Sequence, residues 1–566
     1  MTKISVTAIR KTARLRFLLT TTAVLASGSL ISANSALAVD DHADWDGVSI
    51  VEGQGTVTDT GVGTTTIDQI SNRAIGEAQE LHIGKMGNVT INQNSKDSLF
   101  VGRVIGDHSD PTQILGKLSA DGRVMIIDRN GVFFGQDSTV DASGIAVTTG
   151  DVANTDIMDG NENYTFQNFG NGEIVLEGTV NVNDAGLAAF VAPTVKNSGV
   201  INAKMGNVVI AGGEKATLDL YGDGLVEVAV DGALGNTLLE NKGSINAEGG
   251  SVVMTAQSAK DVVDNVINNE GLINVNAVTQ QGGKIILSGG DKGKVSNTGK
   301  LDASGTTGGS VKVTGQAVEL GSASEIKANA SGGEAGKIET LGAEKLAVNG
   351  KLQAQGEGKR GFIETSAPDV SVDAGTEIRA GKWLLDPTSI VVDNALAGVI
   401  EGQLTVGDAE ITTPAAGVQL GRIDFNSTVD WATANTFTAN AIDDIFFNGG
   451  GGLNATGGGN IVLNAGDDIR MFNTSTGINT NGGDVTLNAF QEVALRGGAG
   501  IDANGGDIII NNQTGGFYGF ANSLNTTGTG TITLNQFKDN IENPPGTVST
   551  IQNAIDALNN TGTGLN

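Results

Sequence analysis

The chain contains no cysteine, and its 566 residues include only 7 prolines, 3 histidines and 4% aromatic residues. The absence of cysteine excludes disulfide bonds and every Cys-His nucleophilic site. His42, His82 and His108 all lie in the first fifth of the chain, so a Ser-His-Asp site in the rest of it is also excluded. A chain of this composition must be stabilised by backbone hydrogen bonds and a stacked apolar interior.

Positive charge is also scarce, since 34 Lys and Arg residues face 63 Asp and Glu residues, for a net charge of −29. Such a chain is repelled by nucleic acid and by anionic lipid surfaces. The acidic residues are spread along the sequence, which is typical of a solvated outer surface. We therefore expect no nucleic-acid partner.

The N-terminus has the pattern of a signal peptide. A basic region that ends at Arg16 is followed by a short apolar stretch, Phe17 to Ile31, and then by Ala36-Leu37-Ala38. This A-x-A sequence predicts cleavage after residue 38. The apolar stretch is too short, and too interrupted by Thr and Ser, for a membrane anchor. We expect an exported protein that begins at Val39.

Glycine is abundant, with 84 residues, and it punctuates short aliphatic runs. The hydrophobic fraction of 39% is too high for a disordered chain. In the first repetitive region, a Gly-x-aliphatic-x-Ala/Val phrase begins at Gly199, Gly243, Gly271, Gly299 and Gly350, and a second Gly-led phrase follows each of them. From Gly283 to Gly361 the second phrase recurs every 25 to 27 residues. Such a period indicates a solenoid.

A more regular repeat follows, in which Gly459, Gly483, Gly506 and Gly530 are 24, 23 and 24 residues apart. Units of this length with three short strands predict an all-β fold, an elongated right-handed parallel β-helix. Val485 and Leu487 should face its core and Thr486 the solvent. We expect the Asn residues that end these phrases to stack as a hydrogen-bonded ladder rather than to bind a ligand: Asn464, Asn488, Asn511 and Asn535.

The pattern divides the chain into six parts. Trp383-Leu-Leu-Asp-Pro387 breaks the repeat, and Val548, Ile551, Ile555 and Leu558 fall at helical spacing after two prolines. The expected parts are a signal peptide (1–38), a domain that does not follow the repeat (39–198), β-helix repeats (199–382), an irregular insertion or junction (383–448), regular β-helix repeats (449–540) and a tail or capping helix (541–566).

The stretch from Gln113 to Gly144 does not follow the simple repeat. Its apolar runs predict strands over Ile114–Leu118, Val124–Ile127 and Val132–Phe134, joined by Asp-Gly and Asn-Gly turns. Upstream, further strands are expected at Val48–Ile50, Val57, Thr65–Ile67, Leu81–Ile83 and Val89–Ile91.

The ordered series Ile67–Ile75, Leu81–Gly84, Val89–Gln93, Asp110–Gly116 and Asp121–Gly135 resembles the secretion domain of filamentous-haemagglutinin-like exoproteins of two-partner secretion systems. The family's Asn-Pro-Asn-Gly motif is Asp128-Arg129-Asn130-Gly131 here, and Ala78 stands where the family usually has an aromatic residue.

The resemblance implies export through an outer-membrane POTRA-barrel transporter, from the periplasm of a Gram-negative bacterium to the medium or the cell surface. Candidates for recognition by that transporter are Gln113, Gly116, Asn130 and Gly131. Asn130 should hold the turn through its side chain, and Gly131 should adopt positive φ.

Catalytic chemistry is represented only by two acidic pairs, Asp443-Asp444 and Asp467-Asp468. β-Helical glycan-cleaving enzymes use such carboxylates, but the neighbouring motifs of those enzymes are missing, so we interpret the pairs as exposed turn residues. They could also hold Ca²⁺ weakly. We expect no cofactor and no metal site.

The favoured interpretation is a non-enzymatic adhesin or haemagglutinin-like virulence protein that binds a glycan or protein receptor. The alternatives are a surface polysaccharide-degrading β-helix and a truncated carrier of a contact-dependent toxin.

Overall fold

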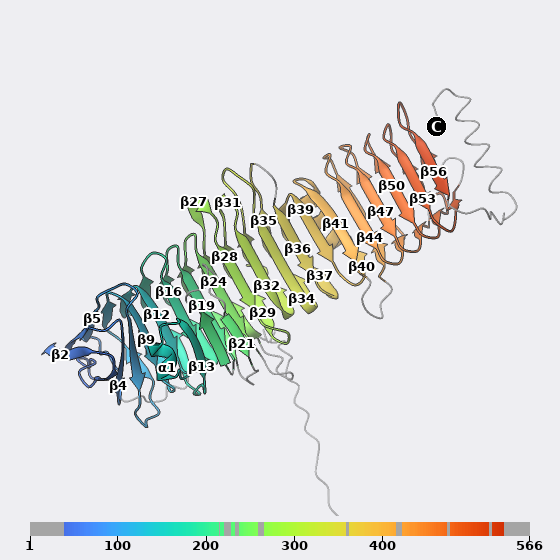
Figure 1. Cartoon of the computed structure of the whole chain (residues 1–566). Helices are drawn as coiled ribbons and strands as arrows, with labels where there is room; N and C mark the ends of the chain where they lie inside the picture. Colours follow the sequence, from blue (N-terminus) through green and yellow to red (C-terminus); the bar gives the residue numbers. More distant parts are fainter. Residues whose placement is uncertain are drawn as a thin grey trace, which may run out of the picture. The chain divides into compact units, whose positions relative to one another are not determined.

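The computed structural model describes residues 39–536, except 214, 220–227, 232–236, 258–264, 358–360, 415–420, 473–475 and 520–522. These residues form a parallel β-solenoid, in which most strands pair in parallel with the strand one turn further along the chain (Figure 1). The expected all-β solenoid is thereby confirmed. The expected signal peptide (1–38) and capping helix (541–566) lie outside the described residues.

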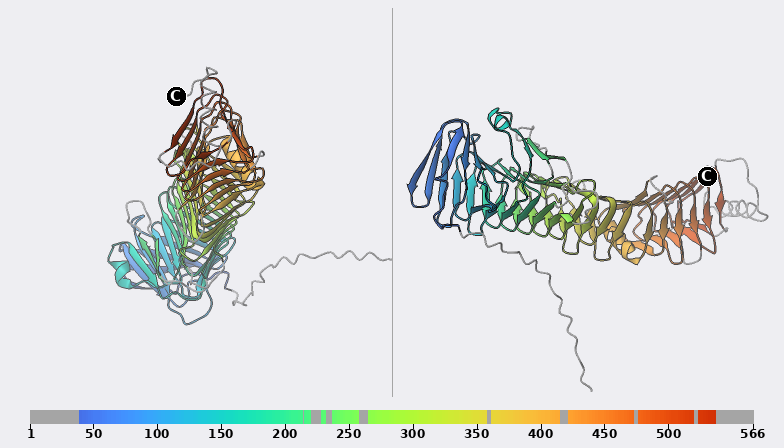
Figure 2. Two further views of the ribbon diagram at one scale, coloured as in Figure 1. Left: turned by 90° about the vertical axis from the view of Figure 1, so that its right-hand side faces the viewer. Right: turned by 90° about the horizontal axis from the view of Figure 1, so that it is seen from below.

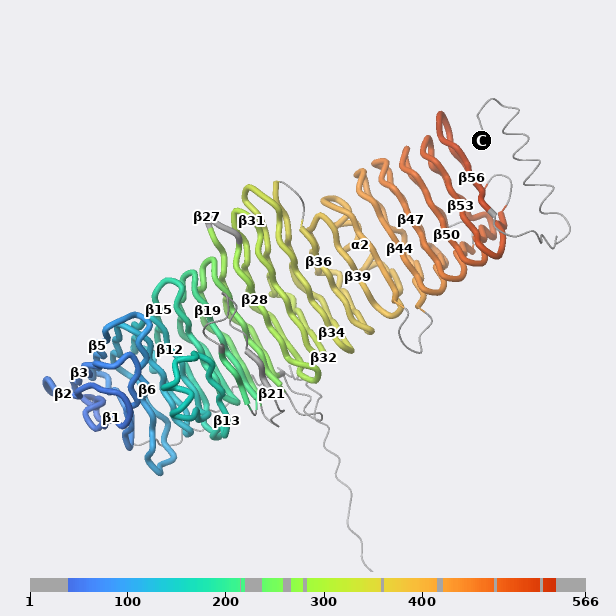
Figure 3. Tube along the Cα trace, viewed as in Figure 1, coloured from blue at the N-terminus to red at the C-terminus, as the bar shows by residue number. Residues whose placement is uncertain are grey.

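One ladder of strands runs through the described chain without a break, from β4 to β56 (Figure 3). Its strands are β4 (Arg73–Ala78), β6 (Leu99–Val104), β9 (Arg123–Ile127), β12 (Gly144–Thr148), β16 (Leu187–Val191), β19 (Asn207–Gly212), β24 (Ser251–Ala256), β28 (Lys284–Ser288), β32 (Ser310–Leu320), β34 (Lys337–Val348), β36 (Phe362–Ser366), β39 (Lys382–Asp386), β41 (Asp408–Thr413), β44 (Phe437–Ala441), β47 (Ile461–Ala465), β50 (Val485–Ala489), β53 (Ile508–Asn512) and β56 (Ile532–Gln536). We call it the first ladder.

Two further ladders complete each turn up to residue 380. The second ladder comprises β7 (Thr112–Ile114), β10 (Gly131–Phe134), β14 (Glu173–Leu176), β17 (Thr194–Asn197), β22 (Leu238–Asn241), β25 (Asn265–Asn269), β29 (Lys294–Asn297), the ends of β32 and β34, and β37 (Asp369–Val372). The third comprises β3 (Thr64–Gln69), β5 (Asn88–Asn92), β8 (Lys117–Ala120), β11 (Thr139–Ala142), β15 (Thr179–Val182), β18 (Val200–Asn202), β23 (Ser244–Asn246), β26 (Leu272–Asn274), β30 (Lys300–Asp302), β33 (Glu325–Lys327), β35 (Lys351–Ala354) and β38 (Glu377–Ala380). A short pair, β27 (Ala277–Gln281) and β31 (Gly305–Thr307), lies outside the ladders.

Within residues 383–448, two of the three ladders are replaced by new sheets. The second and third ladders end, and two new sheets begin: β40 (Ile390–Val392), β42 (Ile423–Phe425), β45 (Ile445–Phe447), β48 (Ile469–Met471), β51 (Val493–Leu495) and β54 (Phe517–Tyr518); and β43 (Thr428–Trp431), β46 (Gly452–Ala455), β49 (Gly477–Thr480), β52 (Gly500–Asp502) and β55 (Leu524–Asn525). The expected interruption does not occur in the first ladder, because β39 pairs with β41 and β41 with β44.

Helix α2 (Asn394–Leu404) lies between β40 and β41, where the new sheets begin. The sequence analysis did not predict it. The Asp393 carboxylate caps it by accepting from the backbone N–H groups of Ala395 and Leu396, both at 3.0 Å. The buried Gln403 side chain bonds the backbone of Ala380 through its oxygen and its nitrogen, at 3.0 and 2.9 Å. The helix is thus fastened to the last strand of the third ladder.

The glycine phrases of the sequence correspond to one corner of the solenoid. A Cβ atom added to Gly243, Gly271 or Gly299 would lie 2.1–2.2 Å from the carbonyl oxygen of the glycine one rung before it. No side chain fits at that distance, so glycine repeats at every rung. Between the corners, alternate residues are buried: Val485 and Leu487 face the core, and Thr486 is half-exposed, as predicted.

The N-terminal end and one side of the solenoid carry antiparallel additions. Strands β1 (Ser49–Glu52) and β2 (Gly55–Gly61) pair antiparallel with β4 and β3. An accessory unit of α1 (Asn154–Met158), β13 (Asn163–Gln167), β20 (Lys215–Asp219) and β21 (Val228–Asp231) packs against the first ladder, and the two share a second, smaller apolar core (Figure 2). No helix among the described residues is long and apolar enough to cross a membrane.

Two strand predictions need correction. The run Ile114–Leu118 is not one strand, because the chain turns a corner at Leu115-Gly116 and the run is divided between β7 and β8. Leu81–Ile83 is not a strand either, since only Ile83 forms an isolated bridge, to Ile114. Both runs are apolar because they turn inside the solenoid, and apolarity alone does not distinguish a buried corner from a strand.

Candidate functional site

The turn that opens β10 is organised by Asp128, which the sequence analysis treated only as a departure from the family motif. Its side chain is fully buried. Oδ1 accepts from the N–H of Asn130 at 2.9 Å, and Oδ2 accepts from the N–H and the hydroxyl of Thr112, both at 2.8 Å. Burial raises the pKa of Asp128, and these hydrogen bonds oppose the rise. The carboxylate therefore ties the turn to the preceding rung.

Asn130 and Gly131 occupy the turn itself. The Asn130 amide nitrogen donates to the carbonyl of His108 at 2.6 Å, so the side chain fastens a neighbouring loop, and the Asp128 carboxylate holds the turn instead. The expectation that Asn130 holds the turn through its side chain is therefore wrong. Gly131 has φ +106°, as predicted, and a Cβ atom there would lie 2.4 Å from the carbonyl oxygen of Glu173.

Gln113 and Gly116 lie on either side of the corner after β7. Gln113 pairs with Phe133 of β10, close to the turn, and its N–H donates to Nδ1 of His82 at 3.0 Å. Burial lowers the pKa of that imidazole. Gly116 lies beyond the other end of β7, where a Cβ atom would meet the carbonyl oxygen of Gly87 at 2.2 Å. The structure thus brings Gln113, Asn130 and Gly131 together and places Gly116 apart.

A groove of about 800 Å³ opens beside the turn. Its lining includes Arg103, His108, Asn130, Asp151 and Phe169. Arg103 donates to the side chain of Asn154 at 2.5 Å and to the carbonyl of Val152 at 2.7 Å. The groove is therefore bounded by the turn on one side and by the accessory unit on the other.

The accessory unit is held to the solenoid by a buried ionic cluster that sequence reasoning missed. Glu162, only 3% exposed, bonds the guanidinium groups of both Arg73 and Arg123. Arg73 also donates to the Tyr164 hydroxyl at 2.8 Å and to the carbonyl of Ile157 at 3.0 Å. Glu162 has φ +57°, an unusual backbone conformation that these contacts maintain. A Glu in a polar loop gives no sequence signal of its distant arginine partners.

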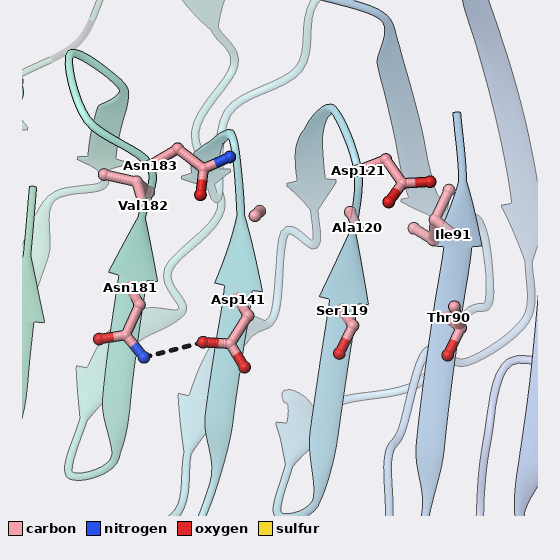
Figure 4. A pocket seen from close by; sticks show the side chains of 10 residues that line it. Thr90, Ile91, Ser119, Ala120, Asp121, Asp141, Asn181, Val182 and Asn183 are labelled. Atoms are coloured by element: carbon pink, nitrogen blue, oxygen red, sulfur yellow. Dashed lines mark hydrogen bonds between the residues drawn. The ribbon is translucent and has the colours of Figure 1, made fainter. Parts of the chain in front are cut away.

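A smaller hollow of about 210 Å³ lies on the third ladder (Figure 4). Thr90, Ser119, Asp141 and Asn181 line its floor from four successive strands. The Asn181 amide donates to the Asp141 carboxylate at 2.9 Å and accepts from Asn202 at 2.8 Å. This is the beginning of a ladder of polar side chains along the outside of the solenoid.

The acidic pairs occupy a corner between the first ladder and the sheet that begins with β40. Among the described residues, Asp443, Asp444 and Asp467 are the three acidic side chains close enough to share a cation, with oxygen atoms within 4.8 Å of one another. Burial, and then the Asp443 carboxylate, raise the pKa of Asp444 to about 6. Asp468 is partnered by Arg470, and its Oδ1 accepts from the N–H of Glu492 at 2.8 Å. The corner is a mutually repelling set of carboxylates stabilised in part by backbone donors.

Residues 43–313 match the family model described as the TPS secretion domain. The match extends past residue 198, where the sequence analysis ended this domain. A heme/hemopexin-binding protein of Haemophilus influenzae is 28% identical over 251 residues, which are 43% of this chain and 27% of that protein. A second protein of the same description from Haemophilus influenzae is 28% identical over 260 residues, 42% of this chain and 27% of the relative. This chain thus matches about a quarter of the length of these relatives.

The crystal structure of the HMW1 secretion domain from Haemophilus influenzae superposes with a TM-score of 0.52 at 23% identity, covering 60% of this chain and all of that one. That likeness supports the solenoid fold. The family match covers the turn at Asn130, the groove and the accessory unit. Residues 43–313, just under half of the chain, are thus a TPS secretion domain, the domain of exoproteins of two-partner secretion systems.

Proposed function

We propose that the chain is a non-enzymatic surface exoprotein that presents the outer faces of its solenoid for adhesion after export. One observation carries this proposal: the first ladder continues from the secretion domain through β56 without a break. The described residues after 313 are thus further turns of the same solenoid. A stack of turns offers extended polar faces rather than an enclosed catalytic cleft.

Adhesion is tested with the mature chain purified from the medium and labelled. Saturable binding to candidate target cells, displaced by unlabelled protein, is expected. Binding that does not saturate on any cell type tested would contradict an adhesive role. The relatives are named as heme/hemopexin-binding proteins, so the same preparation is also titrated with hemin and with hemopexin. A shift in hemin absorbance, or a complex with hemopexin, would assign the chain a role in heme or hemopexin binding instead of adhesion.

Absence of enzymatic activity is part of the proposal, because the motifs that accompany the catalytic carboxylates of β-helical glycan-cleaving enzymes are missing around the acidic corner. The variant Asp467→Asn/Asp468→Asn should behave as the wild type when polysaccharides are assayed for new reducing ends or unsaturated products. Cleavage by the wild type that is lost in the double variant would instead establish the alternative, a glycan-degrading β-helix.

Export is assigned to an outer-membrane POTRA-barrel transporter, with Gln113, Gly116, Asn130 and Gly131 as the recognition residues. In the folded protein these four residues do not form one exposed recognition site, since Gly116 lies apart from the turn and the Asn130 amide nitrogen is bonded to the carbonyl of His108. Recognition through Asn130 would therefore act on the chain before the turn has folded.

The substitution Asn130→Ala distinguishes recognition of Asn130 by the transporter from a purely structural role of this residue. Asn183→Ala is the matched control, because Asn183 also lies in a turn of the secretion domain and donates one side-chain bond, to Ser143 at 3.0 Å. Recognition predicts that Asn130→Ala accumulates in the periplasm while Asn183→Ala is exported. Equal export of both, with Asn130→Ala destabilised, would assign Asn130 a structural role only.

A further inference from the structure

The first ladder carries a notch on its outer side near the C-terminal end of the described chain, where β44, β47, β50 and β53 lie side by side (Figure 1). Ile442 follows β44 and is 50% exposed, and Phe490 follows β50 and is 45% exposed. Gly466 stands on the rung between them. A Cβ atom at Gly466 would meet the carbonyl oxygen of Ile442 at 2.0 Å, so the gap between the two apolar side chains is enforced by the backbone.

The notch opens onto a groove of about 790 Å³ whose wall is the predicted asparagine ladder. Each amide nitrogen donates to the preceding amide oxygen: Asn464 to Asn440 at 2.6 Å, Asn488 to Asn464 at 2.5 Å and Asn511 to Asn488 at 2.6 Å. A primary amide has two N–H donors and two acceptor lone pairs, and the ladder uses one of each. A second donor and a second acceptor therefore remain on each internal amide, repeated at every rung, about 4.8 Å apart.

No ionisable side chain lines this groove, although the chain carries a net charge of −29. Carboxylates border the groove and would repel an anion. Glu410 accepts from the Asn440 amide nitrogen at 2.8 Å, and Asp443 and Asp467 directly follow Ile442 and Gly466 at the corner. An anionic ligand is therefore disfavoured. The lining, with no ionisable group, favours a ligand that is uncharged, that bears hydroxyl groups able to donate and accept, and that has an apolar face for Phe490. A neutral pyranose chain meets all three requirements.

We propose that this groove binds a neutral linear polysaccharide laid along the solenoid axis, with one sugar ring seated between Ile442 and Phe490 over Gly466. The hydroxyl groups exchange hydrogen bonds with the free donors and acceptors of Asn464, Asn488 and Asn511. The inference rests on the proposed adhesive function and names its ligand class. It requires no catalytic step.

The test is affinity electrophoresis of the mature chain in native gels containing dextran, mannan, galactan or β-glucan, with heparin and polygalacturonate as anionic comparisons. Retardation by at least one neutral polymer and by neither anionic polymer is expected. Phe490→Ala should weaken that retardation about fivefold, because an aromatic ring stacked on a ligand contributes on this order. No retardation by any neutral polymer, or equal retardation by the anionic polymers, would overturn the proposal.

Phe472→Ala is the matched control, because Phe472 is also an exposed aromatic (39%) but contacts Phe446 outside the notch. It should bind as the wild type does. Equal loss in both variants would show non-specific aromatic adsorption and would overturn the site. Cell adhesion that persists in Phe490→Ala after polymer retardation is lost would overturn the groove as the adhesive site, while leaving the adhesive function in place on another face. Loss of adhesion and retardation together in Phe490→Ala alone would support both.

Discussion

At the scale of single residues, the secretion domain depends on a buried carboxylate rather than on the conspicuous Asn-Gly pair. Asp128 accepts three hydrogen bonds from two segments of the chain. Asp128→Ala leaves the N–H and hydroxyl of Thr112 without an acceptor in a buried place, which should cost about 3 kcal/mol. Urea unfolding of the mature chain should show a lower midpoint for Asp128→Ala.

The control for this prediction is Asp137→Ala, which removes an exposed carboxylate from the same domain. It should leave the midpoint unchanged. If the two variants unfold at the same urea concentration, the Asp128 carboxylate does not organise the turn.

Asp444 gives a prediction about pH. Its folded-state pKa of about 6 exceeds the ordinary value of 3.8, so the folded state binds a proton that the unfolded state has released between about pH 4 and 6. Stability therefore falls as the pH rises through this window and stays lower above it. Asp444→Asn, which keeps an oxygen to accept from the N–H of Asp468, should stabilise the chain by about 1 kcal/mol at pH 8 after allowance for solvent screening.

The measurement is the melting temperature of wild type and Asp444→Asn from pH 3.5 to 8. The variant should melt higher above pH 6, and the two curves should converge near pH 4. A constant difference at every pH would show that Asp444 does not titrate in this range.

At the scale of elements, asparagine ladders do different work inside and outside the solenoid. Inside, the amide nitrogens of Asn197, Asn241 and Asn269 donate along the axis at 2.6–2.8 Å, and Asn297 continues to Ser324 at 2.6 Å. All of these side chains are buried. Asn269→Ala leaves a donor of Asn241 and an acceptor of Asn297 unpaired, which should cost about 3 kcal/mol.

Asn246→Ala is the comparison for the inner ladder, since Asn246 donates to Asn202 at 3.0 Å on the partly exposed outer face. Water can replace that bond, so the cost should be about 1 kcal/mol or less. Thermal unfolding of the two variants measures the difference. Equal destabilisation would contradict the distinction between the buried and the exposed ladder.

The features of the solenoid that could be predicted from the sequence are those that repeat. The glycine column, the alternation at Val485 and Leu487, and the outer asparagine ladder each recur at the spacing of one rung, so every copy reinforces the same register. Helix α2 occurs once and was missed, although Asp393 followed by Leu396, Val399, Ile400 and Leu404 has the cap and spacing of a short helix. The pairing of Glu162 with Arg73 and Arg123 could not be predicted, because it joins segments with no shared pattern.

At the scale of the whole molecule, the secretion domain and the rungs after it share one continuous ladder. Folding can therefore begin in the N-terminal turns and add rungs in sequence order, each new rung pairing with the last. A chain with no disulfides to close is suited to crossing a membrane unfolded and forming its solenoid as it emerges.

Fractionation of cells that express the full chain, with and without an outer-membrane transporter of the two-partner type, tests this account most directly. With the transporter, the account predicts a mature chain beginning at Val39 in the medium or on the cell surface, where it resists added protease as a folded solenoid. Without the transporter, the mature chain should stay in the periplasm and be degraded there. Equal amounts of folded protein outside the cells in both strains would contradict it.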